Sequence, residues 1–258
     1  MTPASNPLPT VAILAGGLAT RLRPVTNTVP KSLLEVNGEP FAVHQLRLLQ
    51  SKGIRRVVLC VGHLGQLIQR AIGDGSALGL QVDYSFDGPA LLGTAGAIRN
   101  ALPSLGDSFF VMYGDSYLPC DYAAIARNFD AAAVLGMMTV FRNEGKWDAS
   151  NVEFEAGKLK ADQIKEGQLG AGKILAYSKI NRTPRMRYID YGLGMFRAKA
   201  FQRLPAREAS DLTEVYTDLL QRNQLAAFEV RQRFYEIGSP AGLRETAEFL
   251  AAPGANQD

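Results

Sequence analysis

The residues of this sequence that could bind phosphate lie near its start. An apolar run at residues 11–15 is typical of a buried strand, and it ends in two glycines, Gly16 and Gly17. The cations Arg21 and Lys31 follow in a loop rich in proline and threonine. Free backbone N–H groups and fixed positive charge together favour phosphate binding. A surface loop with solvated cations would show the same pattern, so the residues alone leave both interpretations open.

A candidate metal ligand lies about a hundred residues further on. Asp115 follows Gly114 directly after the apolar run at residues 109–113, so its carboxylate should project from the end of a buried strand. Mg²⁺ is commonly held by one or two protein carboxylates together with substrate phosphates, and this position supplies one. The same dipeptide also fits a simple turn.

The spacing excludes two common phosphate loops. A Walker loop needs a glycine before its lysine, and Pro30 precedes Lys31 here. The dinucleotide fingerprint G-x-G-x-x-G is also missing after Gly16. The sequence therefore predicts a different kind of phosphate site.

Residues 14–33 resemble the N-terminal signature of sugar-1-phosphate nucleotidylyltransferases, L-A-G-G-x-G-T-R-L-x-P-x-T-x-x-x-P-K-x-L. The matching positions are Leu14, Ala15, Gly16, Gly17, Thr20, Arg21, Leu22, Pro24, Thr26, Pro30, Lys31 and Leu33. Ala19 departs from the pattern, because the family usually has glycine there. The resemblance implies that Leu14 to Gly17 bind the nucleotide and that Arg21 and Lys31 hold the triphosphate during catalysis. It also implies that Asp115 binds the metal ion.

Two later segments extend the resemblance on the nucleotide and metal side. Residues 92–97, L-G-T-A-G-A, match a family segment that implies nucleotide binding by Gly93 and Thr94. Gly93 would allow backbone amides to approach a flat base edge, and Thr94 would start a helix. Residues 236–240 match the frame of the family's D-x-G-x-P motif, with Glu236 in place of the second metal-binding aspartate.

The second half resembles the sugar-phosphate side of the family. Lys179 stands where a family lysine holds the sugar phosphate, Asp190 and Gly192 lie in a counterpart of N-A-G-I, and Asn151 begins a strand that lines the sugar site. Ser178, Asp190 and Tyr191 depart from the family's residues. These segments look most like the branch of heptose- and mannose-1-phosphate guanylyltransferases. The Asp190 carboxylate can accept two hydroxyl hydrogen bonds, which suits a sugar rich in hydroxyls.

The resemblance implies transfer of a nucleoside monophosphate from a triphosphate to a sugar 1-phosphate, with Mg²⁺ as cofactor and release of pyrophosphate. We expect GTP and a manno-configured heptose or hexose 1-phosphate. The alternatives are UTP, CTP or dTTP with a hexose 1-phosphate, a phosphocholine-type cytidylyltransferase, and a nucleotide-binding regulatory subunit without turnover.

These residues need a scaffold that brings strand ends together. Apolar strands alternate with helices at residues 41–51, 64–72 and 94–102, the last ended by Pro103. This alternation predicts an α/β fold with a Rossmann-like, mostly parallel sheet and helices on both faces. From residue 131 on, strand-like runs predict an antiparallel sugar-site extension, followed by helices at 212–222 and from Ser239. We expect a loose tail at residues 1–10 and one nucleotidyltransferase domain at 11–252, whose nucleotide-binding part is 11–130 and whose sugar-phosphate part is 131–252.

The composition excludes several partners. A net charge of +3 on 258 residues is too small to indicate a nucleic-acid surface, and we find neither a signal peptide nor a membrane-spanning run. Cys60 and Cys120 have no metal or redox spacing, which fits the reducing cytoplasm. No hexapeptide repeat is present, so we expect no left-handed β-helix of the kind some family members carry. The sequence does not indicate an oligomeric state.

Overall fold

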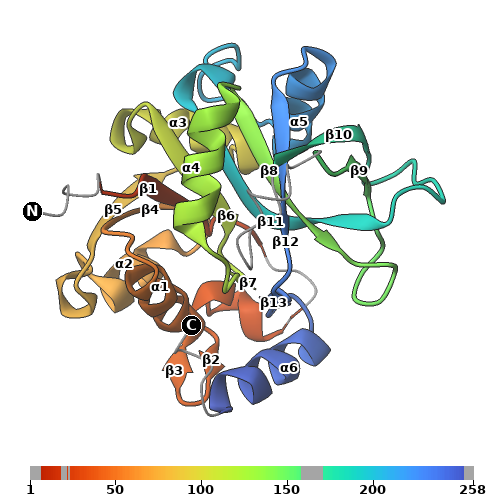
Figure 1. Cartoon of the computed structure of the whole chain (residues 1–258). Helices are drawn as coiled ribbons and strands as arrows, with labels where there is room; N and C mark the ends of the chain where they lie inside the picture. Colours follow the sequence, from red (N-terminus) through yellow and green to blue (C-terminus); the bar gives the residue numbers. More distant parts are fainter. Residues whose placement is uncertain (1–6, 19–21, 23, 158–170, 253–258) are drawn as a thin grey trace, which may run out of the picture.

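The computed structural model describes residues 7–18, 22, 24–157 and 171–252. Its centre is a nine-stranded sheet with the order β5-β4-β1-β6-β11-β8-β12-β10-β9 (Figure 1). The strands are β1 (Thr10–Leu14), β4 (Arg56–Val61), β5 (Gln81–Phe86), β6 (Ser108–Tyr113), β8 (Gly136–Arg142), β9 (Val152–Glu155), β10 (Ala171–Tyr177), β11 (Tyr188–Arg197) and β12 (Leu225–Val230).

The two halves of the sheet differ in strand direction. The first four strands, β5, β4, β1 and β6, are all parallel, so their carboxyl ends meet at one edge. In the second half β11 is antiparallel to β6 and β8, while β12 is parallel to β8. The last strand, β9, also pairs with β11, so the second half curls back on itself. The predicted fold class, a mostly parallel sheet with an antiparallel extension, is confirmed.

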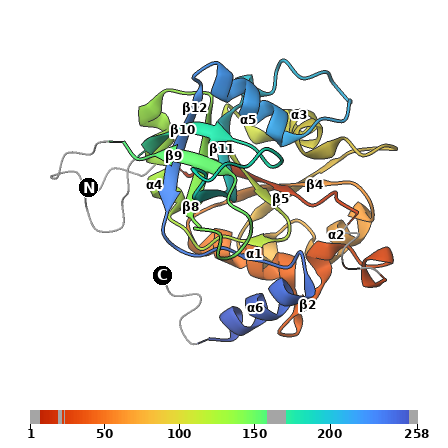
Figure 2. The same cartoon turned by 90° about the vertical axis from the view of Figure 1, so that its right-hand side faces the viewer.

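Helices cover both faces of the sheet, because its strands are buried on both sides. The helices are α1 (Phe41–Ser51), α2 (Gly65–Ile72), α3 (Gly93–Leu105), α4 (Tyr122–Ala132), α5 (Leu212–Gln221) and α6 (Pro240–Ala251). Along β1, Val11 and Ile13 pack with α1, α2 and α4, whereas Ala12 packs with α3 and α5. Figure 2 shows α3 and α5 above the sheet and α1 and α2 below it.

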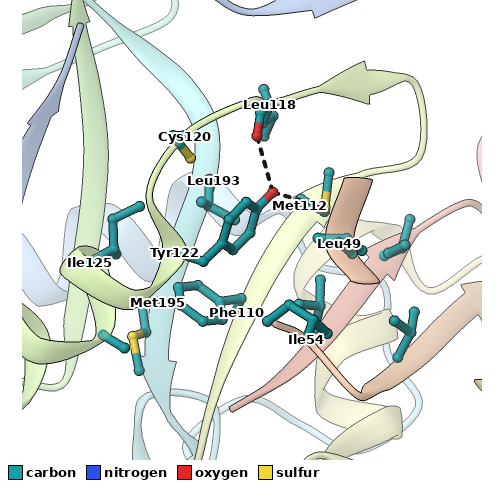
Figure 3. Packing of buried hydrophobic residues seen from close by; sticks show 14 of the residues in the cluster. Leu49, Ile54, Phe110, Met112, Leu118, Cys120, Tyr122, Ile125, Leu193 and Met195 are labelled. Atoms are coloured by element: carbon teal, nitrogen blue, oxygen red, sulfur yellow. Dashed lines mark hydrogen bonds between the residues drawn. The ribbon is translucent and has the colours of Figure 1, made fainter. Parts of the chain in front are cut away.

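The α4 side of the core is built around aromatic contacts. The Tyr122 ring meets Phe110 edge to face, with centroids 5.4 Å apart. Its hydroxyl, which is buried, donates to the Leu118 carbonyl at 3.4 Å and lies near the Met112 sulfur (Figure 3). These contacts fix the segment after β6, which is the segment that carries Asp115.

The C-terminal helix α6 packs away from the main sheet, against two short ribbons (Figure 1). These ribbons are β2 (Glu35–Val36) with β3 (Glu39–Pro40), and β7 (Ser116–Tyr117) with β13 (Tyr235–Glu236). Ser239 caps α6 by accepting a hydrogen bond from Gly242 N–H at 3.0 Å, as the sequence predicts. Phe249 of α6 stacks on Tyr235 with a centroid distance of 3.9 Å.

Two helix predictions were incomplete. Pro103 does not end α3, which continues to Leu105. The Leu105 side chain is buried in the core, which offsets part of the cost of a proline within a helix. Helix α4 was not predicted, although Asp121 caps it by accepting from Ala124 N–H at 2.8 Å. Among the described residues, no helix is long and apolar enough to cross a membrane.

Candidate active site

The carboxyl ends of the four parallel strands enclose a pocket of about 240 Å³. Its walls include every described residue that was predicted to bind the nucleotide, namely Leu14, Ala15, Gly16, Gly17, Lys31, Gly93 and Thr94, together with the predicted metal ligand Asp115. Arg21, the predicted triphosphate clamp, lies outside the described residues. Strand topology, rather than local sequence, thus brings together residues that are far apart along the chain.

A lysine and a carboxylate meet at the β6 side of the pocket. Lys31 Nζ donates to Asp115 Oδ2 at 2.8 Å, with side chains that are 20% and 29% exposed. Lys31 opens a short 3-10 helix, Lys31–Leu33, directly after Pro30. Asp115 is fixed by Gly114, whose N–H donates to the Leu14 carbonyl at 2.9 Å. Both charged groups therefore lie on rigid backbone and remain accessible to a ligand.

The two glycines that follow β1 have different surroundings. A Cβ atom on Gly16 would lie 3.0 Å from the backbone nitrogen of Gly62, which is tighter than ordinary packing allows. A Cβ atom on Gly17 would have no described atom within 4 Å. A side chain at Gly16 would therefore crowd the backbone that follows β4, whereas the space at Gly17 is open to the pocket.

Gly93 and Thr94 join the pocket to the start of α5. Gly93 has a positive φ of 69°, and a Cβ atom there would lie 2.5 Å from the Ser210 carbonyl oxygen. Thr94 Oγ1 accepts from Leu212 N–H at 2.7 Å and donates to Asp211 Oδ2 at 3.3 Å. The prediction that Thr94 starts its helix needs adjustment, because α3 begins at Gly93 and the threonine hydroxyl binds the neighbouring helix.

Asp87 also lines the pocket, and sequence reasoning missed it. It directly follows β5, and its Oδ2 accepts from Leu92 N–H at 3.2 Å. Burial raises the pKa of the Asp87 carboxyl, and burial also raises the pKa of the nearby Cys60 thiol to about 12. The signal was present in the sequence, since Asp87 follows β5 much as Asp115 follows β6.

The predicted sugar-side residues lie together, but none of them lines this pocket. Asn151 Oδ1 accepts from Asp190 N–H at 2.9 Å, and Asp190 Oδ1 accepts from Gly192 N–H at 3.0 Å. Burial raises the pKa of Asp190, while the Gly192 N–H and the charge of Lys179 oppose that rise. A Cβ atom on Gly192 would lie 3.8 Å from the Ser116 hydroxyl, so this group adjoins the turn that carries Asp115.

Glu236 lies beside Asp115 along the backbone. Strand β13 pairs with β7 so that Glu236 faces Ser116, and Ile237 N–H donates to the Asp115 carbonyl at 2.9 Å. The Glu236 carboxylate itself accepts from Gly238 N–H at 2.5 Å and from the Ser239 hydroxyl at 3.3 Å. Its oxygens are thus turned toward the start of α6. Among the described residues, no three His, Cys, Asp or Glu side chains gather in one metal-binding group.

A sequence comparison decides the family. The family model described as nucleotidyl transferase matches residues 10–252. The chain belongs to this family. It is a nucleotidyltransferase, as the N-terminal signature predicts.

Several relatives resemble the chain over most of its length. It is 28% identical over 241 residues to the N-acetylmuramate alpha-1-phosphate uridylyltransferase of Neisseria meningitidis, covering 93% of this chain and 97% of the relative. It is 30% identical over 243 residues to the mannose-1-phosphate guanylyltransferase of Mycobacterium tuberculosis, covering 92% of this chain and 64% of the relative. The catalytic subunit beta of the Danio rerio mannose-1-phosphate guanylyltransferase is 31% identical, with coverages of 88% and 61%. The chain therefore spans less than two thirds of both guanylyltransferases.

Solved structures share the fold. HddC from Yersinia pseudotuberculosis, complexed with GMP-PN, superposes with a TM-score of 0.69 at 22% identity, covering 94% of this chain and 100% of HddC. UDP-glucose pyrophosphorylase complexed with UDP-glucose gives a TM-score of 0.73 at 15% identity, with coverages of 93% and 97%. At sequence identities of 22% and 15%, this similarity shows a shared fold.

Proposed function

We propose that this nucleotidyltransferase transfers a nucleoside monophosphate from a nucleoside triphosphate to a sugar 1-phosphate, with GTP and a manno-configured hexose or heptose 1-phosphate as substrates. The observation that carries the reaction is the pocket in which Gly17, Lys31 and Asp115 meet. The pair of substrates is supported by mannose-1-phosphate guanylyltransferases among the relatives, such as those of Danio rerio and Mycobacterium tuberculosis. The uridylyltransferase of Neisseria meningitidis makes UTP the main competing nucleotide.

The chemistry requires positioning and charge neutralisation rather than a covalent enzyme intermediate. A phosphate oxygen of the sugar 1-phosphate attacks the α-phosphorus of the triphosphate in line, the bond to the β-phosphate oxygen breaks, and pyrophosphate leaves. Backbone N–H groups at Gly16 and Gly17 would hold the triphosphate, and Lys31 would neutralise the charge that develops on it. Arg21 would assist Lys31 as the family signature implies, and Lys179 would hold the incoming sugar phosphate.

The donor set fits Mg²⁺. Asp115 supplies a hard, partly exposed carboxylate at the pocket wall, and substrate phosphates would complete the coordination. Glu236 already accepts hydrogen bonds from Gly238 N–H and the Ser239 hydroxyl, which leaves it fewer acceptor positions for a metal ion. When bound, the ion supplies positive charge that neutralises the phosphate oxygens. The cytoplasm is the proposed compartment, because Cys60 and Cys120 are both buried and unpaired.

The proposal is tested by pyrophosphate release from four nucleoside triphosphates against a panel of sugar 1-phosphates, with phosphocholine as a further acceptor. GTP with mannose 1-phosphate or a manno-heptose 1-phosphate should give the highest kcat/KM. The Asp115→Asn variant should lose activity by at least about a hundredfold while keeping its Tm. Asp83→Asn, on the exposed part of β5, is the matched control and should remain active. Turnover only with CTP and phosphocholine, or with no pair at all, would contradict the proposal.

A further inference from the structure

Two segments on the sugar side leave the sheet at the same edge as the pocket. Strand β11 is antiparallel to both β6 and β8, and β12 is parallel to β8, so β8 and β12 run in the direction of the four parallel strands. Their carboxyl ends therefore lie at the edge where sheets of this kind bind ligands. The segments that follow them are the loop 143–150, which leads to Asn151, and residues 231–234, which lead to β13.

The loop 143–150 is organised by one buried side chain, that of Asn143. Its carboxamide nitrogen donates to the Asp148 carbonyl and, at 3.1 Å, to Ser150 Oγ, while its Oδ1 accepts from Trp147 N–H at 3.3 Å. The Asn143 backbone N–H donates to a carbonyl directly before β11 at 3.1 Å. The base of the loop is thus fixed on the sheet, whereas the side chain of Trp147 is 47% exposed.

Arg233, from the segment after β12, contacts this exposed ring. Its guanidinium carbon lies 3.7 Å from the centroid of the Trp147 ring and 4.9 Å from that of the Tyr235 ring. It also forms an ion pair with Glu245 of α6. The guanidinium group is planar and weakly hydrated, so it stacks well on aromatic faces, and tryptophan is its best partner. Arg233 therefore joins the loop to β13 and α6.

The backbone around Arg233 is itself firmly placed. The neighbouring Phe234 meets Phe141 of β8 edge to face, with ring centroids 6.0 Å apart, and meets Tyr191 of β11 in the same way at 5.9 Å. On the other side, Tyr235 stacks on Phe249 of α6. Arg233 is thus a fixed point from which the position of the loop can be set.

The loop ends at a residue that orders the sugar side. Asn151 follows Ser150 directly, and its Oδ1 accepts from Asp190 N–H at 2.9 Å. We propose that Arg233 is a positioning residue for the sugar 1-phosphate, because by holding Trp147 it fixes the loop 143–150 and, through the loop, Asn151. This proposal rests on the proposed function and extends it to a contact that lies outside the pocket.

Trp147 is the only tryptophan of the chain, so tryptophan fluorescence reports this contact directly. In Arg233→Ala, acrylamide should quench the fluorescence more strongly and the anisotropy should fall, because the ring is released. The KM for the sugar 1-phosphate that wild type uses best should rise about 3- to 30-fold, the range for a lost cation–π contact, while the KM for the triphosphate should stay unchanged. Arg233→Lys keeps the charge and should give an intermediate KM. Arg231→Ala, in the exposed part of the same segment, is the matched control and should behave as wild type.

Variants of Trp147 test the same contact from the loop. Its half-exposed side chain lies outside the core, so Trp147→Ala should fold even if Arg233→Ala does not. Trp147→Ala should raise the KM for the sugar 1-phosphate, and Trp147→Phe, which keeps an aromatic face, should stay close to wild type. The double variant Arg233→Ala/Trp147→Ala should raise this KM no further than either single variant, because both changes break one contact.

The contrary outcomes distinguish this inference from the proposed function. If wild type is active and Trp147→Ala keeps the wild-type KM for the sugar 1-phosphate, the inference alone fails. Equal rises in the KM for both substrates would show a general structural role and overturn it, as would additive effects in the double variant. If wild type turns over no sugar 1-phosphate, the proposed function fails and the inference fails with it.

Discussion

The nucleotide side and the sugar side of the molecule use their predicted residues differently. On the nucleotide side, Gly17 and Lys31 come from the N-terminal signature and Asp115 from the turn after β6, and all three converge on one pocket. On the sugar side, the Asn151 carboxamide and the Asp190 carboxylate accept backbone N–H groups of their own neighbourhood. Residues of the first kind are available to a ligand, whereas those of the second kind also hold the fold together. Mutations of ligand-facing residues on the nucleotide side should therefore change activity with little effect on stability. Mutations on the sugar side should change activity and stability together.

Strand direction explains the difference. Parallel strands place all their carboxyl ends at one edge, so a short motif after each strand is enough to assemble the pocket. In the second half the chain curls until β9 meets β11, and Asn151 precedes β9 while Asp190 lies within β11. The relative placement of Asn151 and Asp190 depends on the register and curvature of β9 and β11. Their side chains accept backbone N–H groups there and so help to fix this arrangement.

The largest effect is expected at Lys31. Lys31→Met removes the one cation that lines the pocket among the described residues and should lower kcat/KM by about a hundredfold or more. The Tm should change little, because the Lys31–Asp115 pair is partly exposed and such pairs contribute at most about 1 kcal/mol. Steady-state kinetics and thermal unfolding measure the two quantities, with the exposed Lys199→Met as control. If the loss were confined to a higher KM for the sugar 1-phosphate, Lys31 would bind the sugar 1-phosphate and not the triphosphate.

Alanine substitutions of the two glycines after β1 should have different effects, one on stability and the other on ligand binding. Gly16→Ala forces a Cβ atom against Gly62 and should destabilise the fold by about 1–3 kcal/mol. Gly17→Ala meets no described atom, so its Tm should match wild type while KM for the triphosphate rises about tenfold, since the methyl group would occupy space meant for phosphate. Denaturant unfolding and initial rates distinguish the two. Wild-type kinetics in Gly17→Ala would show that the ligand does not approach there.

Much of the architecture could be predicted from local signals, and the misses have physical causes. The span of α1 and the Ser239 cap of α6 follow from apolar spacing and capping chemistry. The end of α3 was wrong because tertiary burial of Leu105 competes with the preference of proline to stop helices. Helix α4 carried a readable signal in Asp121 and its alanines.

The sequence predicted the site residues that belong to continuous motifs and missed the one that belongs to none. The glycines, Lys31 and Asp115 belong to short segments with fixed spacing. Asp87 belongs to no such motif. Its position directly after a strand was readable in the sequence, but its place in the pocket wall follows from the pairing of β5 with β4. The turned position of the Glu236 carboxylate likewise depends on its bonds to Gly238 and Ser239 and could not be read from the motif.

The smallest effect concerns Asp190 and the dual role of the sugar side. Burial raises the pKa of Asp190 in the folded protein, so the native state binds its proton more tightly than the unfolded chain does. For this group, stability falls as pH rises from the unfolded value, about 3.9, through the raised native pKa. The Asp190→Asn variant replaces the carboxylate with an uncharged carboxamide, whose oxygen could still accept from Gly192 N–H.

Asp190→Asn should therefore raise Tm slightly at pH 7, and the gain should shrink as the pH is lowered toward 4. Asp74 provides a control of opposite sign, because the hydroxyl and N–H of Ser76 lower its pKa. Asp74→Asn should lose stability at pH 7 relative to wild type, and that loss should shrink toward acid pH. Thermal unfolding of the three proteins between pH 4 and 8 measures both differences. If Asp190→Asn instead behaves like Asp74→Asn, the Asp190 carboxylate is stabilised in its charged form, and the sugar side resembles the nucleotide side in keeping its charges solvated or paired.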